Sequence, residues 1–240
     1  MTNFSQDSYA LRRDLAYGCR ILGNNGHNDT VLGHVSYREP GADTYWMKPA
    51  EMGLDEVTPE TFIRLDLDGN VVEGKLPRHI EFPIHSEILR AHPEITCVVH
   101  THPIYSIAFA ALDQPLRALS HEGGQLSPPD VPRFTLTSNL IRSRELGEKL
   151  EECIGNRPAC LLQGHGIVTS GTTIQGAILT AINLERACNI QLLASACGPI
   201  TWSSDEDALA KQIEMTAAKA QLNVWNYYCR KINAAMNASF

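Results

Sequence analysis

Val98-Val99-His100-Thr101-His102-Pro103 is the stretch of this 240-residue sequence from which both the fold and the chemistry can be inferred. Its apolar, β-branched residues predict a strand that begins near Ile95. Because side chains alternate along a strand, His100 and His102 are expected to project from the same face, about 7 Å apart. That spacing suits two imidazoles that bind one cation.

A third imidazole could come from His165, which lies in Leu161-Leu162-Gln163-Gly164-His165-Gly166 at the end of another apolar segment. The flanking glycines carry no side chain, so the backbone and a metal ion can come close there. Three histidines with an open fourth position are typical of a catalytic rather than a structural metal site. A His-x-His pair alone is often incidental, so the interpretation needs support from the rest of the chain.

The rest of the chain predicts helices and strands without repeats, linkers or a break in composition. Apolar residues recur at three- to four-residue spacing in the predicted helices, which are 7–23, 83–91, 103–112, 140–154, 172–196 and 204 to beyond 228. Short β-prone runs predict strands at 31–37, 45–48, 62–67, 71–72, 95–100, 159–162 and 166–169. We therefore expect one α/β domain over 1–240, with a mixed sheet, flanking helices and C-terminal helices from about 172.

Composition and charge restrict the class of protein. The formal net charge is -7 with 20 Lys and Arg, which argues against nucleic acid or an anionic membrane as the main partner. No window approaches the roughly 18 uninterrupted apolar residues of a membrane span, and the first residues show no secretory signal. The seven cysteines are scattered and include no CxxC pair, as expected in a reducing compartment. We expect a cytoplasmic protein.

Several motifs together resemble the class II aldolase/adducin family, and the resemblance extends from about residue 11 to residue 196. Their order and spacing agree with the family, including nineteen positions from Glu81 to His100. The motifs are Gly33-His34-Val35-Ser36, Met47-Lys48-Pro49, Asp66-Leu67-Asp68-Gly69, Glu73-Gly74, Glu81, the strand through His102-Pro103, and Leu162-Gln163-Gly164-His165-Gly166. The resemblance implies a three-layer α/β/α fold around a mixed, largely antiparallel sheet.

The resemblance also implies one divalent metal ion per chain, held by His100, His102 and His165. Zinc is the expected ion, with manganese, cobalt or iron as alternatives. Glu81 matches the family's acid/base carboxylate, and because the epimerase branch usually carries Asp there, a glutamate favours the carbon–carbon lyases. A Lewis acid stabilises the enolate that is left when a carbon–carbon bond breaks, and the carboxylate moves the proton. Alternatively, Glu81 only caps the helix that starts at Pro83.

Three positions depart from the sugar-phosphate members of the family, which bind phosphate through an Asn, a Thr/Ser-Gly pair and two serines. His34, Ala50-Glu51 and His79-Ile80 stand at those positions here. Phosphate binding needs short hydroxyls and accessible N–H groups, and a carboxylate at Glu51 would repel a dianion if it faced the pocket. The site is therefore not expected to take a phosphorylated sugar.

Hydrogen-bonding and cationic groups near these positions instead predict a small substrate that bears a carboxylate. The candidate substrate-binding residues are His34, Ser36, Lys48, Arg78 and His79. Lys48 and Arg78 could alternatively be ordinary solvated surface charges. Family members with similar Gly-His-x-Ser and Gly-His-Gly patterns include decarboxylases of dihydroxyphthalate and of carboxylated ring-fission dienoates, which this chain resembles more than the sugar aldolases.

The family's tyrosine proton donor has no counterpart, because 116–121 contains no tyrosine. His121 is the nearest candidate to replace it as a catalytic proton donor, although it could be a turn residue before Gly123-Gly124. His85 and His92 are expected to be structural or exposed. His27 lies in a polar loop, where it either lines the pocket or is solvated.

These observations favour a metal-dependent carbon–carbon lyase, with decarboxylation of a non-phosphorylated hydroxy or oxo acid as the expected reaction. The resemblance implies a homotetramer with active sites at the subunit interfaces. Aldol cleavage of a small hydroxy-oxo acid is the alternative reaction, and an iron-dependent oxygenase is a more distant one. A non-catalytic interaction domain like the adducin head is disfavoured, since that branch has lost metal histidines that this chain keeps.

Overall fold

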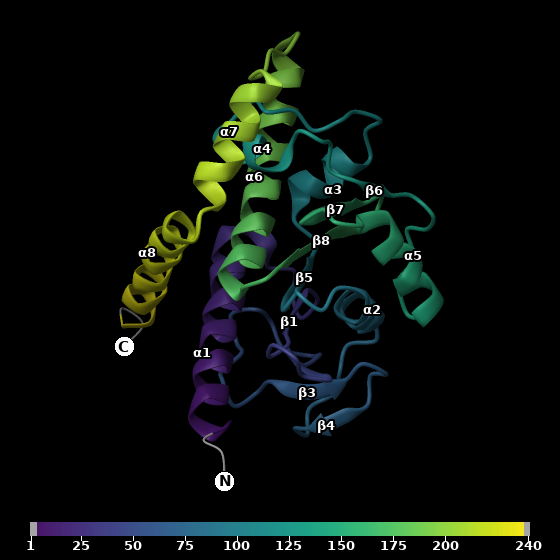
Figure 1. Cartoon of the computed structure of the whole chain (residues 1–240), viewed down its shortest axis with the longest axis vertical. Helices are drawn as coiled ribbons and strands as arrows, with labels where there is room; N and C mark the ends of the chain where they lie inside the picture. Colours follow the sequence, from purple (N-terminus) through teal and green to yellow (C-terminus); the bar gives the residue numbers. More distant parts are fainter. Residues whose placement is uncertain (1–3, 238–240) are drawn as a thin grey trace.

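An eight-stranded sheet forms the centre of the molecule, of which the computed structural model describes residues 4–237 (Figure 1). The strand order is β4-β3-β2-β1-β5-β8-β7-β6, and every described pair is antiparallel except β6 with β7. The prediction of a mixed, largely antiparallel sheet is confirmed. The strands are β1 His34–Tyr37, β2 Thr44–Met47, β3 Ile63–Asp66, β4 Val71–Glu73, β5 Cys97–Thr101, β6 Arg133–Phe134, β7 Ala159–Leu162 and β8 Gly166–Gly171.

Helices cover both faces of this sheet and make three layers (Figure 1). Val98 packs in an apolar cluster with residues of α2 and α5, whereas its neighbour Val99 packs on the other face with residues of α1, α3 and α6. The layers arise from the alternation of side chains along β5. The helical elements are α1 Phe4–Leu22, η1 Gly23–His27, α2 Pro83–Ala91, α3 Ile104–Ala110, α4 His121–Leu126, α5 Arg144–Ile154, α6 Ile174–Cys197, α7 Asp205–Thr216 and α8 Ala218–Asn237.

The pairing of β1 with β5 brings histidines from separate motifs to one face of the sheet. His34 lies opposite His100, and Ser36 lies opposite Val98. By alternation these residues share the face that α2 covers, because Val98 packs with α2 while Val35 and Val99 pack on the opposite face. The candidate site therefore forms between the sheet and the start of α2.

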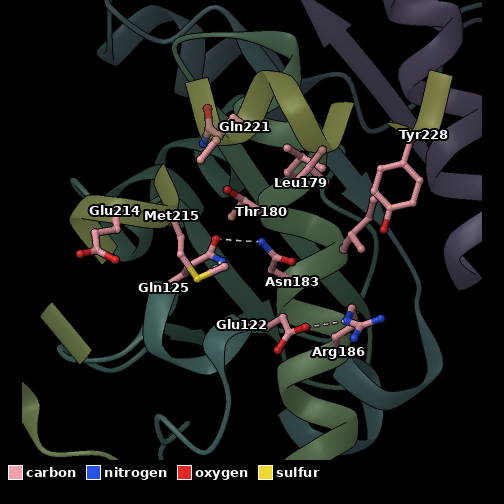
Figure 2. Close-up of a pocket in the computed structure, with 13 residues that line it drawn as sticks. Glu122, Gln125, Leu179, Thr180, Asn183, Arg186, Glu214, Met215, Gln221 and Tyr228 are labelled. Carbon is pink, nitrogen blue, oxygen red and sulfur yellow. Dashed lines mark hydrogen bonds and ion pairs between the residues drawn. The ribbon is translucent and has the colours of Figure 1, made fainter. Parts of the chain in front are cut away.

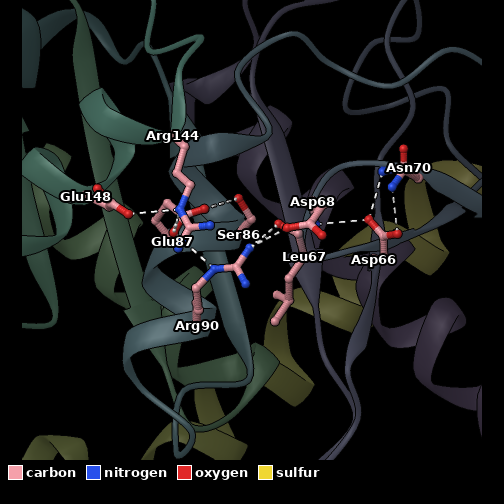
Figure 3. Close-up of polar contacts among 9 residues, drawn as sticks. All are labelled: Asp66, Leu67, Asp68, Asn70, Ser86, Glu87, Arg90, Arg144 and Glu148. Carbon is pink, nitrogen blue, oxygen red and sulfur yellow. Dashed lines mark hydrogen bonds and ion pairs between the residues drawn. The ribbon is translucent and has the colours of Figure 1, made fainter.

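A polar cluster fixes the position of α2 (Figure 3). Arg90 donates to Glu87 on its own helix at 3.1 Å, to the Leu67 carbonyl at 2.8 Å and to Asp68 at 3.0 Å, which ties α2 to the turn between β3 and β4. Arg144 of α5 lies 3.6 Å from the same Glu87 carboxylate. Because Glu81 and His85 are on or beside α2, this cluster also limits how far their side chains can move.

The C-terminal helical region differs from the prediction of one helix from 204 to beyond 228. The structure has α7 and α8 instead, because Ala217 adopts an extended conformation (φ -56°, ψ 136°) between them. The single-helix prediction was wrong because no Gly or Pro marks this break in the sequence. The short helix α4 and the two-residue parallel strand β6 were also not predicted. Within residues 4–237, no helix combines the length and apolar character needed to cross a membrane.

Candidate metal centre and active site

His100 lies near the end of β5, between β1 and β8. Its side chain is fully buried, and Nδ1 donates to the Ile167 carbonyl at 2.9 Å. Burial and the neighbouring imidazoles lower the pKa of His100 well below its usual range, so the ring is neutral. Since a neutral imidazole carries one N–H, Nε2 is left as a bare acceptor.

In His102, as in His100, Nδ1 is hydrogen-bonded and Nε2 is free. The partner of Nδ1 is Asp29, which was not predicted from the sequence. Nδ1 of His102 lies 3.0 Å from a carboxylate oxygen of Asp29, which accepts the N–H and leaves Nε2 of His102 bare. Asp29 lies in the loop between η1 and β1. The polar loop was visible in the sequence, but nothing there indicated that its carboxylate faces β5.

The two bare nitrogens lie close together. Nε2 of His102 is 3.0 Å from Nε2 of His100. Two lone pairs at that distance repel each other unless a cation or a proton lies beside them. The geometry therefore favours a bound cation at this point.

His165 completes the set from the turn between β7 and β8. Its ring centroid lies 4.8 Å from that of His100 and 5.5 Å from that of His102. Both of its ring nitrogens are buried without a hydrogen-bond partner in the described part of the chain. One ligand atom from each of the three histidines lies within 4.8 Å of the others. Three imidazoles that converge in this way are a donor set that suits a divalent transition-metal ion.

Position 166, directly after His165, has room only for glycine. A Cβ at this position would lie 2.8 Å from Cδ2 of His102 and would overlap the Thr101 carbonyl. Gly164, on the other side of His165, has φ +65°, which favours glycine. Gly166 therefore allows the backbone of β5 and the His102 ring to come close to β8.

Glu81 lies beside the three histidines. Its carboxylate is 3.5 Å from Nε2 of His165 and 3.8 Å from Nε2 of His100, and it accepts the Ile141 N–H at 2.7 Å. Burial raises the pKa of this carboxyl, whereas His165 and the Ile141 N–H lower it. The lowering effects are larger in sum, so the pKa of Glu81 lies below its usual range. The alternative in which Glu81 caps a helix is wrong, because α2 has no side-chain cap.

Comparison with known protein families identifies the family of this chain. The model of the Class II Aldolase and Adducin N-terminal domain matches residues 13–192. The chain belongs to this family. The resemblance inferred from the motifs is thereby confirmed.

Individual members of the class II aldolase family extend this comparison. The chain is 30% identical to a 3,4-dihydroxyphthalate decarboxylase of Arthrobacter keyseri, over 93% of this chain and 94% of that protein. It is 32% identical to the meiotically up-regulated gene 14 protein of Schizosaccharomyces pombe, over 86% of this chain and 78% of that protein. Among solved structures, L-fuculose 1-phosphate aldolase from Glaciozyma antarctica PI12 matches with a TM-score of 0.86 at 26% identity, covering 99% of this chain and 94% of that one.

His34 belongs to a buried hydrogen-bonded chain in this class II aldolase family member. Nδ1 of His34 lies 2.6 Å from Nε2 of His85, and Nδ1 of His85 lies 2.7 Å from the Ser36 hydroxyl. His85 is fully buried, and burial lowers its pKa to about 3. His85 was expected to be structural or exposed, and of these two alternatives the exposed one is wrong. Its partners His34 and Ser36 lie on β1, about 50 positions earlier, and no local pattern in the sequence marks these contacts.

Lys48 is buried, so the alternative of a solvated surface charge is wrong for it. Its ammonium donates to the carbonyls of Val31 and Pro49 at 3.2 and 3.0 Å and lies 3.2 Å from Nε2 of His79. Burial lowers the pKa of Lys48 to about 8. Burial and the nearby ammonium lower the pKa of His79 to about 4. Lys48 therefore contacts His79 and the backbone carbonyls on either side of it.

The remaining candidates near the site differ in exposure. Arg78 is partly buried, stacks 4.2 Å over the Phe82 ring and donates to the His79 carbonyl. Glu51 is exposed and has φ +64°. His27 is fully buried and its Nδ1 lies 2.8 Å from the Thr101 hydroxyl, so the solvated-loop alternative is wrong for it. His92 pairs with Glu151 at 2.8 Å away from the site, as expected for a structural residue.

His121 lies on a different part of the molecule. It begins α4 and is exposed, and within the described residues no hydrogen bond or ion pair joins it to the histidine cluster. Its neighbour Glu122 lines a cavity of about 430 Å³ between α4, α6, α7 and α8 and pairs with Arg186 at 2.8 Å (Figure 2). The residues that line this cavity do not include His100, His102 or His165.

Proposed function

We propose that this member of the class II aldolase family is a metal-dependent decarboxylase of a non-phosphorylated hydroxy or oxo carboxylate. The observation that carries the proposal is the buried pair His34 and His79, whose ring centroids lie 4.4 Å apart. His34 also lies 4.9 Å from the ring of His100. These imidazoles stand where the sugar-phosphate enzymes place asparagine and serine. The relative named as a 3,4-dihydroxyphthalate decarboxylase supports the same reaction class.

The metal ligands in this proposal are His100, His102 and His165, with one ion per chain. Zinc is the proposed ion, and manganese, cobalt or iron are alternatives that the same donor set accepts. When bound, such an ion withdraws electron density from a substrate oxygen and so stabilises the negative charge that develops as CO₂ leaves.

Glu81 is the proposed acid/base residue. Decarboxylation breaks a carbon–carbon bond, releases CO₂ and leaves an electron pair on carbon, which must then take up a proton. The Ile141 N–H holds one carboxylate oxygen of Glu81, while the carboxylate remains within 3.8 Å of Nε2 of both His100 and His165. The side chain is thereby oriented toward the place where a substrate and its proton would lie.

The proposed substrate contacts are His34 and His79, with Ser36, Lys48 and Arg78 supporting them. Ser36 and Lys48 are fully buried and contact His85 and His79, respectively, so they orient these imidazoles. His121 remains a proposed proton donor only if a second copy brings it to the site. That role would require the homotetramer with interfacial active sites that the family resemblance implies.

A substrate panel tests the proposal. Purified, metal-loaded protein is assayed with dihydroxybenzene carboxylates and carboxylated oxo-dienoates, and in parallel with fuculose and ribulose phosphates, following CO₂ and aldehyde separately. CO₂ release from the acids and no cleavage of the phosphates is the expected result. Aldehyde without CO₂ from a hydroxy-oxo acid would favour an aldolase, and cleavage of a sugar phosphate without CO₂ from the acids would refute the proposal.

A further inference from the structure

Three buried side chains form a continuous hydrogen-bonded chain that ends at the proposed site. The Ser36 hydroxyl lies 2.7 Å from Nδ1 of His85, and Nε2 of His85 lies 2.6 Å from Nδ1 of His34. Ser36 and His85 are fully buried, and His34 is 2% exposed. Nε2 is therefore the ring nitrogen of His34 that remains for the site.

The protons in this chain can be arranged in two ways. In the first, the Ser36 O–H donates to Nδ1 of His85, Nε2–H of His85 donates to Nδ1 of His34, and His34 carries its proton on Nε2. In the second, every donor and acceptor is exchanged, and Nε2 of His34 is bare. The distance between the two imidazoles requires one hydrogen between them in either case.

The surroundings of Ser36 select the first arrangement. Its hydroxyl contacts His85 and has no other side-chain hydrogen bond within the described residues. In the second arrangement the hydroxyl would accept from His85, and its own proton would be buried without an acceptor. A buried donor without a partner is unfavourable, whereas the first arrangement satisfies every group up to Nε2 of His34.

We infer that Ser36 and His85 are positioning residues that hold His34 in the Nε2–H form, so that His34 donates a hydrogen bond to an anionic oxygen of the substrate. The inference rests on the proposed function, because a carboxylate can only accept such a bond. The inference also means that His34 is not one of the metal ligands. A ring nitrogen of His34 lies within 4.8 Å of ligand atoms of Glu81 and His100, but a protonated Nε2 cannot bind a metal ion.

The tautomer of His34 can be measured without turnover. Full-length protein labelled with ¹⁵N-histidine and loaded with zinc is examined by long-range ¹H–¹⁵N correlation NMR, and signals are assigned by their loss in His34→Gln and His85→Gln. The expected result is that both His34 and His85 carry their proton on Nε2. A proton on Nδ1 of His34 would overturn the inference. Neither outcome depends on whether the protein releases CO₂.

Ser36→Ala tests the origin of this preference. Without the hydroxyl, the two arrangements become similar in energy, so we expect signals of both tautomers and a KM raised about tenfold for the carboxylate substrate, with a smaller change in kcat. Ser170→Ala on β8, another buried serine, is the matched control and should leave the tautomers and KM unchanged. An unchanged Nε2–H population in a folded Ser36→Ala variant would show that Ser36 does not set the tautomer.

Discussion

His34 lies directly opposite His100 across the β1–β5 pair, with ring centroids 4.9 Å apart. His34 is a proposed substrate contact, and His100 is a proposed metal ligand. Because they sit on neighbouring strands of one sheet, the distance between substrate recognition and the metal centre is fixed by backbone pairing. Every substitution near this pair is therefore best judged by both metal retention and turnover.

We predict that His100→Ala and His165→Ala lose the divalent ion while keeping the fold. Each removes one of three nitrogens that converge on one point, and two imidazoles are too few to hold the ion tightly. Metal analysis after gel filtration measures this, with close to one ion per chain expected in the unmodified protein.

His92→Gln is the matched control for metal retention, because His92 pairs with Glu151 and lies outside the cluster. It should retain the ion. Full occupancy in both ligand variants would refute the assignment of the metal centre.

We predict that Glu81→Gln keeps fold and metal but loses turnover by about 10² to 10⁴-fold, the usual contribution of general acid–base catalysis. The amide oxygen can still accept the Ile141 N–H, so the side chain keeps its place but no longer exchanges a proton. Steady-state kinetics and thermal melting are measured together.

Glu87→Gln provides the comparison for Glu81. Glu87 is also buried, but it pairs with Arg90 and Arg144 to hold α2 (Figure 3). Its substitution should lower the melting temperature and leave turnover close to that of the unmodified protein. Near-native turnover in Glu81→Gln would remove the residue from the chemistry.

The sequence was sufficient for most of the sheet and its flanking helices, and it predicted three histidines that the structure brings together, because these features depend on local patterns. Alternation predicts that His100 and His102 share a face, and glycines mark the close approach at His165. The family motifs supplied the link between these segments. The break at Ala217 was missed because alanine favours helix and no Gly or Pro marks the position.

The supporting residues could not be predicted, because their roles depend on contacts between distant segments. Asp29 and His102 are separated by 73 positions, and His85 contacts His34 across 51 positions. Lys48 was left open between surface and site, since its burial depends on the carbonyls of Val31 and Pro49 that surround its ammonium. A single sequence does not report such contacts.

We predict that Asp29→Ala, which removes the acceptor for the His102 Nδ1–H, weakens metal affinity about 10- to 100-fold without unfolding the protein. The Asp29 carboxylate accepts the Nδ1–H of His102 and thereby holds its Nε2 toward the other ligands, and loss of such partners has this typical effect. Asp29 is 38% exposed, so the cost to stability should be small. Competition with a chromogenic chelator measures the affinity, and an unchanged dissociation constant would show that the contact is not needed.

We predict that Gly166→Ala disturbs the metal centre although it adds a single methyl group. The new Cβ would lie 2.8 Å from the His102 ring and overlap the Thr101 carbonyl, so β5 and β8 must separate. A lower melting temperature and reduced metal affinity are expected together. Gly155→Ala is not a suitable control, since Gly155 has φ +52°; Ala159→Gly, on β7, changes the same methyl group without a clash.

Lys48 should make stability depend on pH in the alkaline range. Its pKa is about 8 in the folded protein and 10.5 when unfolded, so between these values the unfolded chain binds the extra proton. The free energy of unfolding contributed by Lys48 therefore rises from pH 8 to 10.5, by up to about 3 kcal/mol, and falls again as the pH is lowered. In Lys48→Met this rise should be absent.

Chemical denaturation of both proteins at several pH values, at equal metal loading and protein concentration, gives the difference. Lys149→Met is the matched control, because Lys149 is exposed and Glu152 raises rather than lowers its pKa. Its removal should therefore leave the rise due to Lys48 intact. If Lys48→Met and the unmodified protein had parallel pH profiles from 8 to 10.5, the ammonium would not be desolvated. Lys48 would then be free to contact a substrate directly instead of through His79.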